Sequence, residues 1–291
     1  MTAGPEVYPD LTHAQYSLLP GASASQLRKL RQGSPLHLRH YLDSPDNDTR
    51  SRGTLRAIHC LVLEQPHNKD AWTNDFAVWG EEPDQISPDG KPMRRAGKAY
   101  EAWLSGQMNR TILNPTEKAE AMAVAGAVLA HPVAAPLLSG GGHSELSGTW
   151  TDEQSGMPCR LRIDRLKRTG PTSWMVIDLK TIDSCAPHRV TQLIGANGWH
   201  IQLAHYIAGI RAIRPGDTVE GCLITVEDSA PHDVAVWVMP LIEEMIAEQE
   251  RQALLATYAE CQRTGIWPGR FTEPQPLALP RYLYPDEDGT P

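Results

Sequence analysis

The chain of 291 residues lacks an apolar stretch long enough to cross a membrane. The longest candidate, Ala119 to Leu138, is rich in alanine and is broken by His131, Pro132 and Pro136, whereas a membrane helix needs about 18 apolar residues. The first 20 residues contain proline, aspartate and histidine where a secretory signal needs an apolar run. We therefore expect neither a membrane anchor nor secretion.

Closely spaced cysteines are also lacking. The chain has five, an odd number, and no two are close in sequence: Cys60, Cys159, Cys185, Cys222 and Cys261. This pattern excludes a zinc ribbon and argues against a disulfide scaffold. We expect a reduced, cytoplasmic protein.

The chain lacks a positive net charge. It has 27 basic and 35 acidic residues, for a net charge of -8. A basic coat over the whole surface is thereby excluded, but a local basic groove is not. Basic residues gather in two places: Arg28, Lys29, Arg31, Arg39, Arg50, Arg52 and Arg56, and then Arg160, Arg162, Arg165, Lys167 and Arg168. These clusters could line a groove for a phosphate backbone, or they could be ordinary solvated and cross-strand paired side chains.

Two common catalytic signatures are absent as well. The run Gly140–Gly142 lacks the Gly-Lys-Ser/Thr ending of a phosphate-binding loop. No Gly-X-Ser-X-Gly sequence is present, so a nucleophile elbow is excluded.

Periodicity predicts an α/β fold with a helical N-terminal part. We expect helices at 26–31, 36–42, 55–63, 96–108, 116–130, 189–196, 201–213 and 241–263, and strands at 76–79, 144–152, 159–168, 173–181, 218–226 and 233–239. Residues 43–53 are predicted to form a loop. The predicted organisation is an irregular lead-in (1–22), one domain (23–270) and a proline-rich acidic tail (271–291).

The strongest chemical signal is Asp178 and Lys180 on the predicted strand 173–181. Residues two apart on a strand project to the same face. A carboxylate beside an ammonium can hold a divalent cation and stabilise charge on a phosphate. The simpler interpretation is a surface ion pair, and this short motif alone does not separate the two.

The preceding strand adds Asp164, with Arg160 and Arg162 alternating before it. If the two strands pair through the turn at 170–171, Asp164 and Asp178 lie side by side, and two such acids repel unless a cation sits between them. The alternative is that Asp164 pairs with a neighbouring arginine, and spacing alone leaves both interpretations open.

Four further residues are ambiguous taken singly. Gln202 and Tyr206 share a helix face and could grip a phosphate or a sugar, but such a polar stripe is common. His59 lies in an apolar helix, where most histidines are structural, and Glu145 is an isolated acid in apolar surroundings.

Taken in order, these segments resemble the PD-(D/E)XK nuclease superfamily, and within it the RecE-type exonucleases (exodeoxyribonuclease VIII-like, related to YqaJ and RecB nucleases). The resemblance covers roughly residues 23–206 and rests on five motifs in the family's order: Ser23-Ala24-Ser25-Gln26-Leu27 with Ser34-Pro35, His59 to Glu64, Cys159 to Leu166, Ile177-Asp178-Leu179-Lys180-Thr181, and Gln202-Leu203-Ala204-His205-Tyr206. One departure is that Gly53 precedes His59 by six residues rather than by one helical turn.

The resemblance implies the fold, a central mixed sheet flanked by helices, and a role for each residue. Asp164 and Asp178 would bind Mg²⁺ or Mn²⁺, with the Leu179 carbonyl and His59 as further ligands. Lys180 would stabilise the transition state or position the attacking water, and Glu145 would hold a water of the metal shell. Four residues would contact DNA: Gln202, Tyr206, Arg160 and Arg162. No iron–sulfur cluster and no ATP are expected.

The implied activity is metal-dependent 5′ to 3′ degradation of linear duplex DNA. It would leave 3′ single strands for recombination through a RecT-type annealing protein. Such proteins are commonly phage-borne, so the host cytoplasm is the expected location, and a ring-shaped homo-oligomer is implied by the same analogy. Two alternatives remain: an endonuclease or single-strand-specific nuclease on the same fold, and a catalytically inactive module that binds DNA ends.

Overall fold

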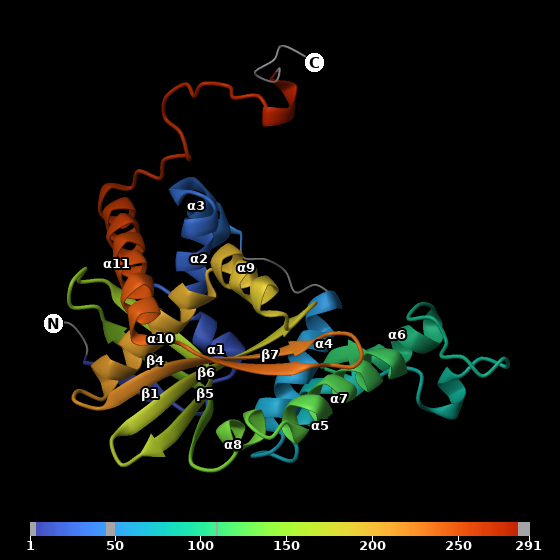
Figure 1. Cartoon of the computed structure of the whole chain (residues 1–291). Helices are drawn as coiled ribbons and strands as arrows, with labels where there is room; N and C mark the ends of the chain where they lie inside the picture. The colour runs from blue at the N-terminus through green and yellow to red at the C-terminus, as the bar shows by residue number, and fades with distance from the viewer. Residues whose placement is uncertain (1–3, 45–49, 109, 285–291) are drawn as a thin grey trace.

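The computed structural model of the chain describes residues 4–44, 50–108 and 110–284. Its centre is a six-stranded sheet in the order β1-β4-β5-β6-β7-β8, with helices on both faces (Figure 1). The strands are β1 (Glu6–Tyr8), β4 (Gly142–Thr151), β5 (Pro158–Gly170), β6 (Ser173–Ile182), β7 (Thr218–Glu227) and β8 (Val234–Val238). Only the β6–β7 pair is parallel, so the sheet is mixed as predicted.

The parallel pair is joined by two helices, α9 (Pro187–Asn197) and α10 (Trp199–Ile213). Gly198 separates them with a φ of +65°, a left-handed conformation that glycine adopts without steric cost. One face of α10 is apolar, and Ile207 and Ile210 pack on the sheet with Leu161. The crossover therefore covers one face of the sheet.

Two hydrophobic cores form, one on each face of the sheet. The first joins the sheet to α2 (Ala24–Gln32), α3 (Pro35–Asp43), α10 and α11 (Leu241–Thr264). The second joins it to α4 (Arg50–His59), the π-helix η1 (Cys60–Glu64), α7 (Pro115–Ala130) and α8 (Ala134–Leu138). Ile177 and Leu179 of β6 face the second core, whereas Val176 faces the first.

A smaller lobe extends from the second core between η1 and α7. It contains α5 (Ala71–Asp75), the parallel pair β2 (Phe76–Val78) and β3 (Thr111–Leu113), the 3-10 helix η2 (Pro83–Gln85) and α6 (Lys98–Ser105). The strand predicted at 76–79 is confirmed, and its partner β3 was not predicted.

Helix ends follow the local sequence. Ser23 caps α2 in a capping box with Gln26, and Asn114 does the same for α7 with Glu117. Each cap satisfies backbone N–H groups that have no partner inside the helix. Among the described helices, none combines the length and the apolar character that crossing a lipid bilayer requires.

The expectation of an irregular lead-in at residues 1–22 is wrong in part. Glu6–Tyr8 pairs with β4, α1 (His13–Ser17) follows, and Ala22 forms a parallel bridge with Cys159. Gly21 permits this bridge, because its φ is +108° and a Cβ there would lie 2.8 Å from the backbone of Pro158. The segment thus adds an edge strand to the sheet, which the sequence pattern did not predict.

Two other boundaries differ from prediction. Of the predicted loop 43–53, residues 45–49 lie outside the described residues, but α4 already begins at Arg50. The predicted tail contains a 3-10 helix, η3 (Arg281–Leu283). The remaining helices and strands predicted above are found, with ends displaced by up to five residues.

Candidate metal and catalytic site

The candidate site lies where the ladder between β5 and β6 ends. That ladder runs from Gly170↔Ser173 to Arg165↔Ile177, and beyond it the strands are no longer paired with each other. Asp164 and Asp178 are the first residues past the last pair. On the other side of β5, Glu145 of β4 stands opposite Asp164, between the pairs Ser144↔Arg165 and Leu146↔Ile163. Three acidic residues therefore stand at one level of three neighbouring strands.

The backbone at Glu145 is unusual, with a φ of +52° in the middle of a strand. This left-handed conformation is costly for a residue with a Cβ, and such strain concentrates at functional sites. Glu145 and Asp164 are skipped in the β4–β5 ladder. The interruption turns both side chains toward the face covered by η1.

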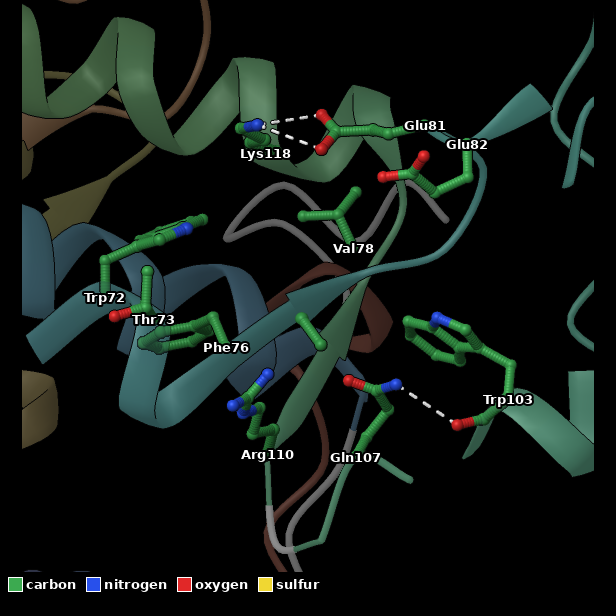
Figure 2. Close-up of a pocket in the computed structure, with 11 residues that line it drawn as sticks. Trp72, Thr73, Phe76, Val78, Glu81, Glu82, Trp103, Gln107, Arg110 and Lys118 are labelled. Carbon is green, nitrogen blue, oxygen red and sulfur yellow. Dashed lines mark hydrogen bonds and ion pairs between the residues drawn. The ribbon is translucent and has the colours of Figure 1, made fainter. Parts of the chain in front are cut away.

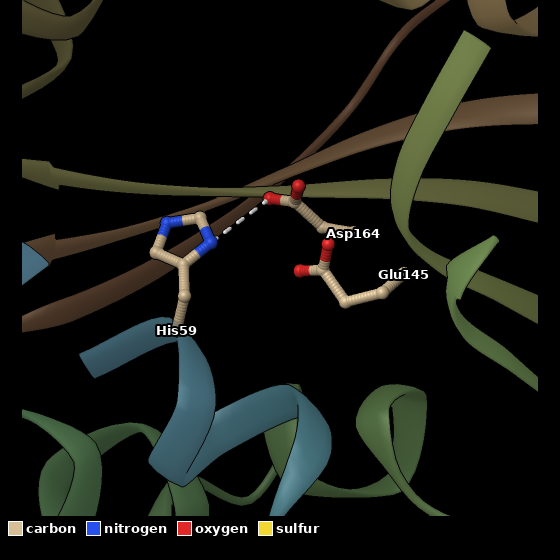
Figure 3. Close-up of side chains that lie close together, drawn as sticks. All are labelled: His59, Glu145 and Asp164. Atoms are coloured by element: carbon tan, nitrogen blue, oxygen red, sulfur yellow. Dashed lines mark ion pairs between the residues drawn. The ribbon is translucent and has the colours of Figure 1, made fainter. Parts of the chain in front are cut away.

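Three side chains converge there, as Figure 3 shows. His59, the last residue of α4, Glu145 and Asp164 each offer a ligand atom, and these atoms lie within 4.8 Å of one another. His59 Nδ1 is 3.8 Å from Asp164 Oδ2, which also accepts a hydrogen bond of 2.8 Å from the Leu179 N–H. An imidazole with two carboxylates can ligate a divalent metal ion. The helix continues past His59 as a π-helix, a form often found at functional sites.

Electrostatics at this cluster favour a bound cation. Burial and the neighbouring charge of Asp164 raise the pKa of Glu145 to about 8, although Arg162 opposes the shift. The pKa of Glu64, in η1, is also raised by burial and by the charge of Asp75. Carboxylates crowded in this way ionise readily only when a cation offsets their repulsion.

Asp178 is held beside this cluster rather than inside it. Its side chain is buried; Oδ2 is 2.6 Å from Lys180 Nζ and Oδ1 accepts a 2.8 Å hydrogen bond from Gln202 Nε2. Oδ2 is buried without a well-directed hydrogen-bond donor among the described residues. Burial raises the pKa of Asp178, and Lys180 works against that shift.

The structure places Gln202 and Tyr206 differently from the expectation that they touch the substrate. Both side chains are buried, and Gln202 Nε2 lies 3.0 Å from the Tyr206 hydroxyl as well as bonding Asp178. Their position indicates that they hold the Asp178 carboxylate. Direct contact of these two residues with DNA stays a prediction.

The predicted DNA contacts Arg160 and Arg162 already have partners within the chain. Arg160 donates to the carbonyls of Tyr16, Ser17 and Leu19. Arg162 donates to Glu145 Oε2 at 2.8 Å and to the Leu11 carbonyl at 2.7 Å. Both arginines thus attach the N-terminal segment to β5, and Arg162 also orients Glu145; their contact with DNA stays a prediction.

The chain is similar to known proteins in sequence and in fold. The family model described as "PDDEXK-like domain of unknown function (DUF3799)" matches residues 23–274. The chain belongs to this family. A crystal structure described as "Putative exonuclease" from Eubacterium rectale is similar in fold, with a TM-score of 0.58 and 12% identity over 92% of this chain and 96% of that one. No curated protein matches this chain in sequence.

One residue of this PDDEXK-like domain was missed by sequence reasoning. Arg28 of α2 donates from Nη1 to Gln202 Oε1 at 3.1 Å and from Nε to the Asn197 carbonyl at 2.5 Å. Because the amide oxygen of Gln202 is occupied by Arg28, its NH₂ group is directed to Asp178. Arg28 precedes Gln202 by 174 positions, so the sequence offers no signal for this pair.

We expect Arg28→Met to lower cleavage by about tenfold, the order of one lost charge-assisted hydrogen bond, because Gln202 could then rotate away from Asp178. Arg31→Met is the matched control, since Arg31 also bonds a carbonyl of α9 but pairs with Glu250 instead. Divalent-metal affinity measured by calorimetry should fall only for Arg28→Met, and Arg28→Lys should restore part of it. Equal losses in both methionine variants would contradict the role given to Arg28.

A second prediction concerns Glu145 in the absence of divalent cations. A carboxyl whose pKa in the folded protein is about 8, against 4.5 ordinarily, binds more protons when folded, so stability falls as pH rises between these values. Glu145→Gln removes that loss, and in EDTA it should gain on the order of 2–4 kcal/mol over wild type at pH 8, but little at pH 5. Urea unfolding at both pH values checks this, with Glu120→Gln, exposed on α7, as control. A gain independent of pH would contradict it.

Proposed function

We propose that this protein is a divalent-metal-dependent exodeoxyribonuclease that hydrolyses linear duplex DNA from its 5′ ends. The observation that carries the proposal is the convergence of His59, Glu145 and Asp164 within 4.8 Å, beside the buried Asp178–Lys180 pair. The family match and the exonuclease description of the similar structure support it. The 5′ polarity, the 3′ single-stranded product and its transfer to a RecT-type annealing protein rest on the family resemblance of the motifs.

The residues present fit a hard divalent cation. Carboxylate oxygens are the preferred ligands of Mg²⁺ and Mn²⁺. Glu145 and Asp164 bring two carboxylates together with His59, and the buried Asp178 carboxylate, paired with Lys180, lies beside them. His59, Glu145, Asp164 and Asp178 would hold the ion. When bound, such an ion lowers the pKa of a coordinated water and offsets charge on a scissile phosphate.

The chain's own residues position the reacting groups. Lys180 presents its ammonium beside Asp178, where it can stabilise negative charge developing on a phosphate oxygen. Trp199 lies with its ring centroid 5.9 Å from that ammonium and limits where it can move. Gln202, fixed by Arg28, keeps the Asp178 carboxylate in place.

The test uses duplexes of one sequence that are open at both ends, blocked at the 5′ ends, blocked at the 3′ ends, or closed into a circle. With Mg²⁺, we expect the open and 3′-blocked duplexes to be degraded and the 5′-blocked duplex and the circle to persist. EDTA should stop all degradation. Cutting of the circle would indicate an endonuclease instead, and tight end binding without hydrolysis would indicate a binding module.

A further inference from the structure

The small lobe carries an aromatic-lined cavity that the proposed catalytic site does not use. Its volume is about 390 Å³, within the range of small-molecule and cofactor sites, about 300–1,000 Å³. Figure 2 shows Trp72 and Phe76 on one side, Trp103 on the other and Val78 between them. The chain has only 18 aromatic residues of the Phe, Trp and Tyr types, so three around one cavity is a marked concentration.

The walls present flat apolar surfaces. Trp72 stacks on the buried ring of Phe76, with centroids 4.9 Å apart and planes inclined by 20°. Trp103 is supported from behind by Trp79 and Tyr100, at centroid distances of 5.2 and 6.1 Å. Trp72 and Trp103 are each partly exposed, so a planar ring could stack on either. Rings held this firmly lose little freedom when a ligand stacks on them.

The rim of the cavity is polar and has two different ends (Figure 2). At one end Lys118 pairs with Glu81 through contacts of 2.8 and 3.1 Å, and the exposed carboxylate of Glu82 stands beside them. At the other end stands the exposed Arg110, whose guanidinium makes no hydrogen bond or ion pair with any other residue in the described ranges. Gln107 lies beside it and donates to the Trp103 carbonyl at 3.1 Å.

This combination fits a nucleotide. A base stacked on the indoles would place its N–H donors toward Glu82 and its phosphate toward Arg110. Base–aromatic stacking with a cation on the backbone is the general mode of single-strand binding. The lobe is also attached to the proposed active site, because α5, which carries Trp72, packs on η1, and η1 directly follows His59.

We propose that this cavity, with walls Trp72 and Trp103 and with Arg110 at its rim, binds an unpaired nucleobase of a DNA single strand and its phosphate. The inference rests on the proposed function for the identity of the strand, which would be the one separated next to the metal site. It adds a binding site that the hydrolytic residues themselves do not require.

The probe is a ten-nucleotide deoxythymidine oligonucleotide with one 2-aminopurine, a base whose fluorescence is quenched by stacking. It is titrated in EDTA, so binding is measured without hydrolysis. We expect quenching with wild type, about tenfold weaker binding with loss of quenching for Trp103→Ala, and partial recovery for Trp103→Phe. Arg110→Ala should weaken binding and lower the slope of log affinity against log salt by about 0.7, the value for one phosphate contact on a single strand.

Matched controls separate this site from general effects. Phe271→Ala and Arg263→Ala change an exposed aromatic and an exposed arginine elsewhere and should leave binding unchanged. Arg110→Ala alters an exposed side chain, so it remains informative if Trp103→Ala does not fold. Wild-type affinity and quenching in Arg110→Ala and in the folded Trp103 variants would overturn the proposal, even if hydrolysis is intact. If the wild-type protein does not hydrolyse DNA, but the quenching of 2-aminopurine still depends on Trp103 and Arg110, only the proposed function is overturned.

Discussion

Replacing Asp178 with asparagine should reduce DNA cleavage by a factor of about 10²–10³ while leaving the protein folded. Lys180 and Gln202 both contact the Asp178 carboxylate. Its Oδ2 atom is buried and has no well-directed hydrogen-bond donor among the described residues. Losing it removes a proposed metal ligand and the partner that orients Lys180, and loss of one preorganised charged group at a hydrolytic centre commonly costs about 10²–10³ in rate. Lys180→Met should act in the same direction.

The sign of the stability change distinguishes a catalytic role from a structural one. Burial raises the pKa of Asp178, which means that its ionised form is disfavoured in the folded protein. Asp178→Asn should therefore match or exceed wild type in urea unfolding at pH 8 in EDTA, although it is inactive. Asp183→Asn is the matched control, because Asp183 follows β6 directly but is exposed and pairs with Arg189. Normal digestion by Asp178→Asn would refute the site.

Much of this architecture could be predicted because its signals are local. Strand β5 alternates apolar and polar residues, and β6, β7 and β8 carry short apolar runs. On a strand, the two-residue spacing of Asp178 and Lys180 places both on one face. The turn at Gly170–Pro171 joins β5 to β6, so the proximity of Asp164 and Asp178 follows from sequence.

What could not be predicted depends on contacts between distant segments. Strand β1 has three residues, and its pairing with β4 is settled by tertiary contacts rather than by propensity. Glutamate rarely adopts the left-handed backbone conformation found at Glu145. The direction of the Glu145 side chain could therefore not be predicted from the sequence. The hydrogen bonds that Arg160 and Arg162 make to carbonyls of residues 11–19 could not be predicted either, because those carbonyls lie about 150 positions earlier in the chain.

The largest expected loss of stability lies at the other side of the sheet, at Arg251 of α11. This side chain is 1% exposed, and it donates to Asp152 Oδ1 at 2.7 Å and to both carboxylate oxygens of Glu248. Asp152 begins the turn between β4 and β5 and is buried as well. Arg251→Met leaves the Asp152 carboxylate buried without its cation, and breaking such a pair costs about 3–5 kcal/mol.

Urea unfolding at pH 7 measures this loss, and Arg263→Met on the same helix is the control, because its pair with Glu260 is exposed and should contribute little. The double variant Arg251→Met, Asp152→Asn should recover part of the stability, since it removes the uncompensated charge. A loss no larger than that of the control would show that water, rather than Arg251, solvates Asp152.

The pH dependence of this loss provides an independent check. Burial alone would raise the pKa of Asp152, but hydrogen bonds from Ser155 and Arg251 hold it below its usual 3.8. A carboxyl with a lowered folded pKa stabilises the protein above its unfolded pKa, and the contribution is lost as pH falls through the folded value. The gap between wild type and Arg251→Met should therefore be full at pH 7 and shrink below about pH 4. Because Asp152 lies in the turn that joins β4 to β5, and these strands carry Glu145 and Asp164, the same variant should also weaken metal binding in proportion to how far that turn loosens.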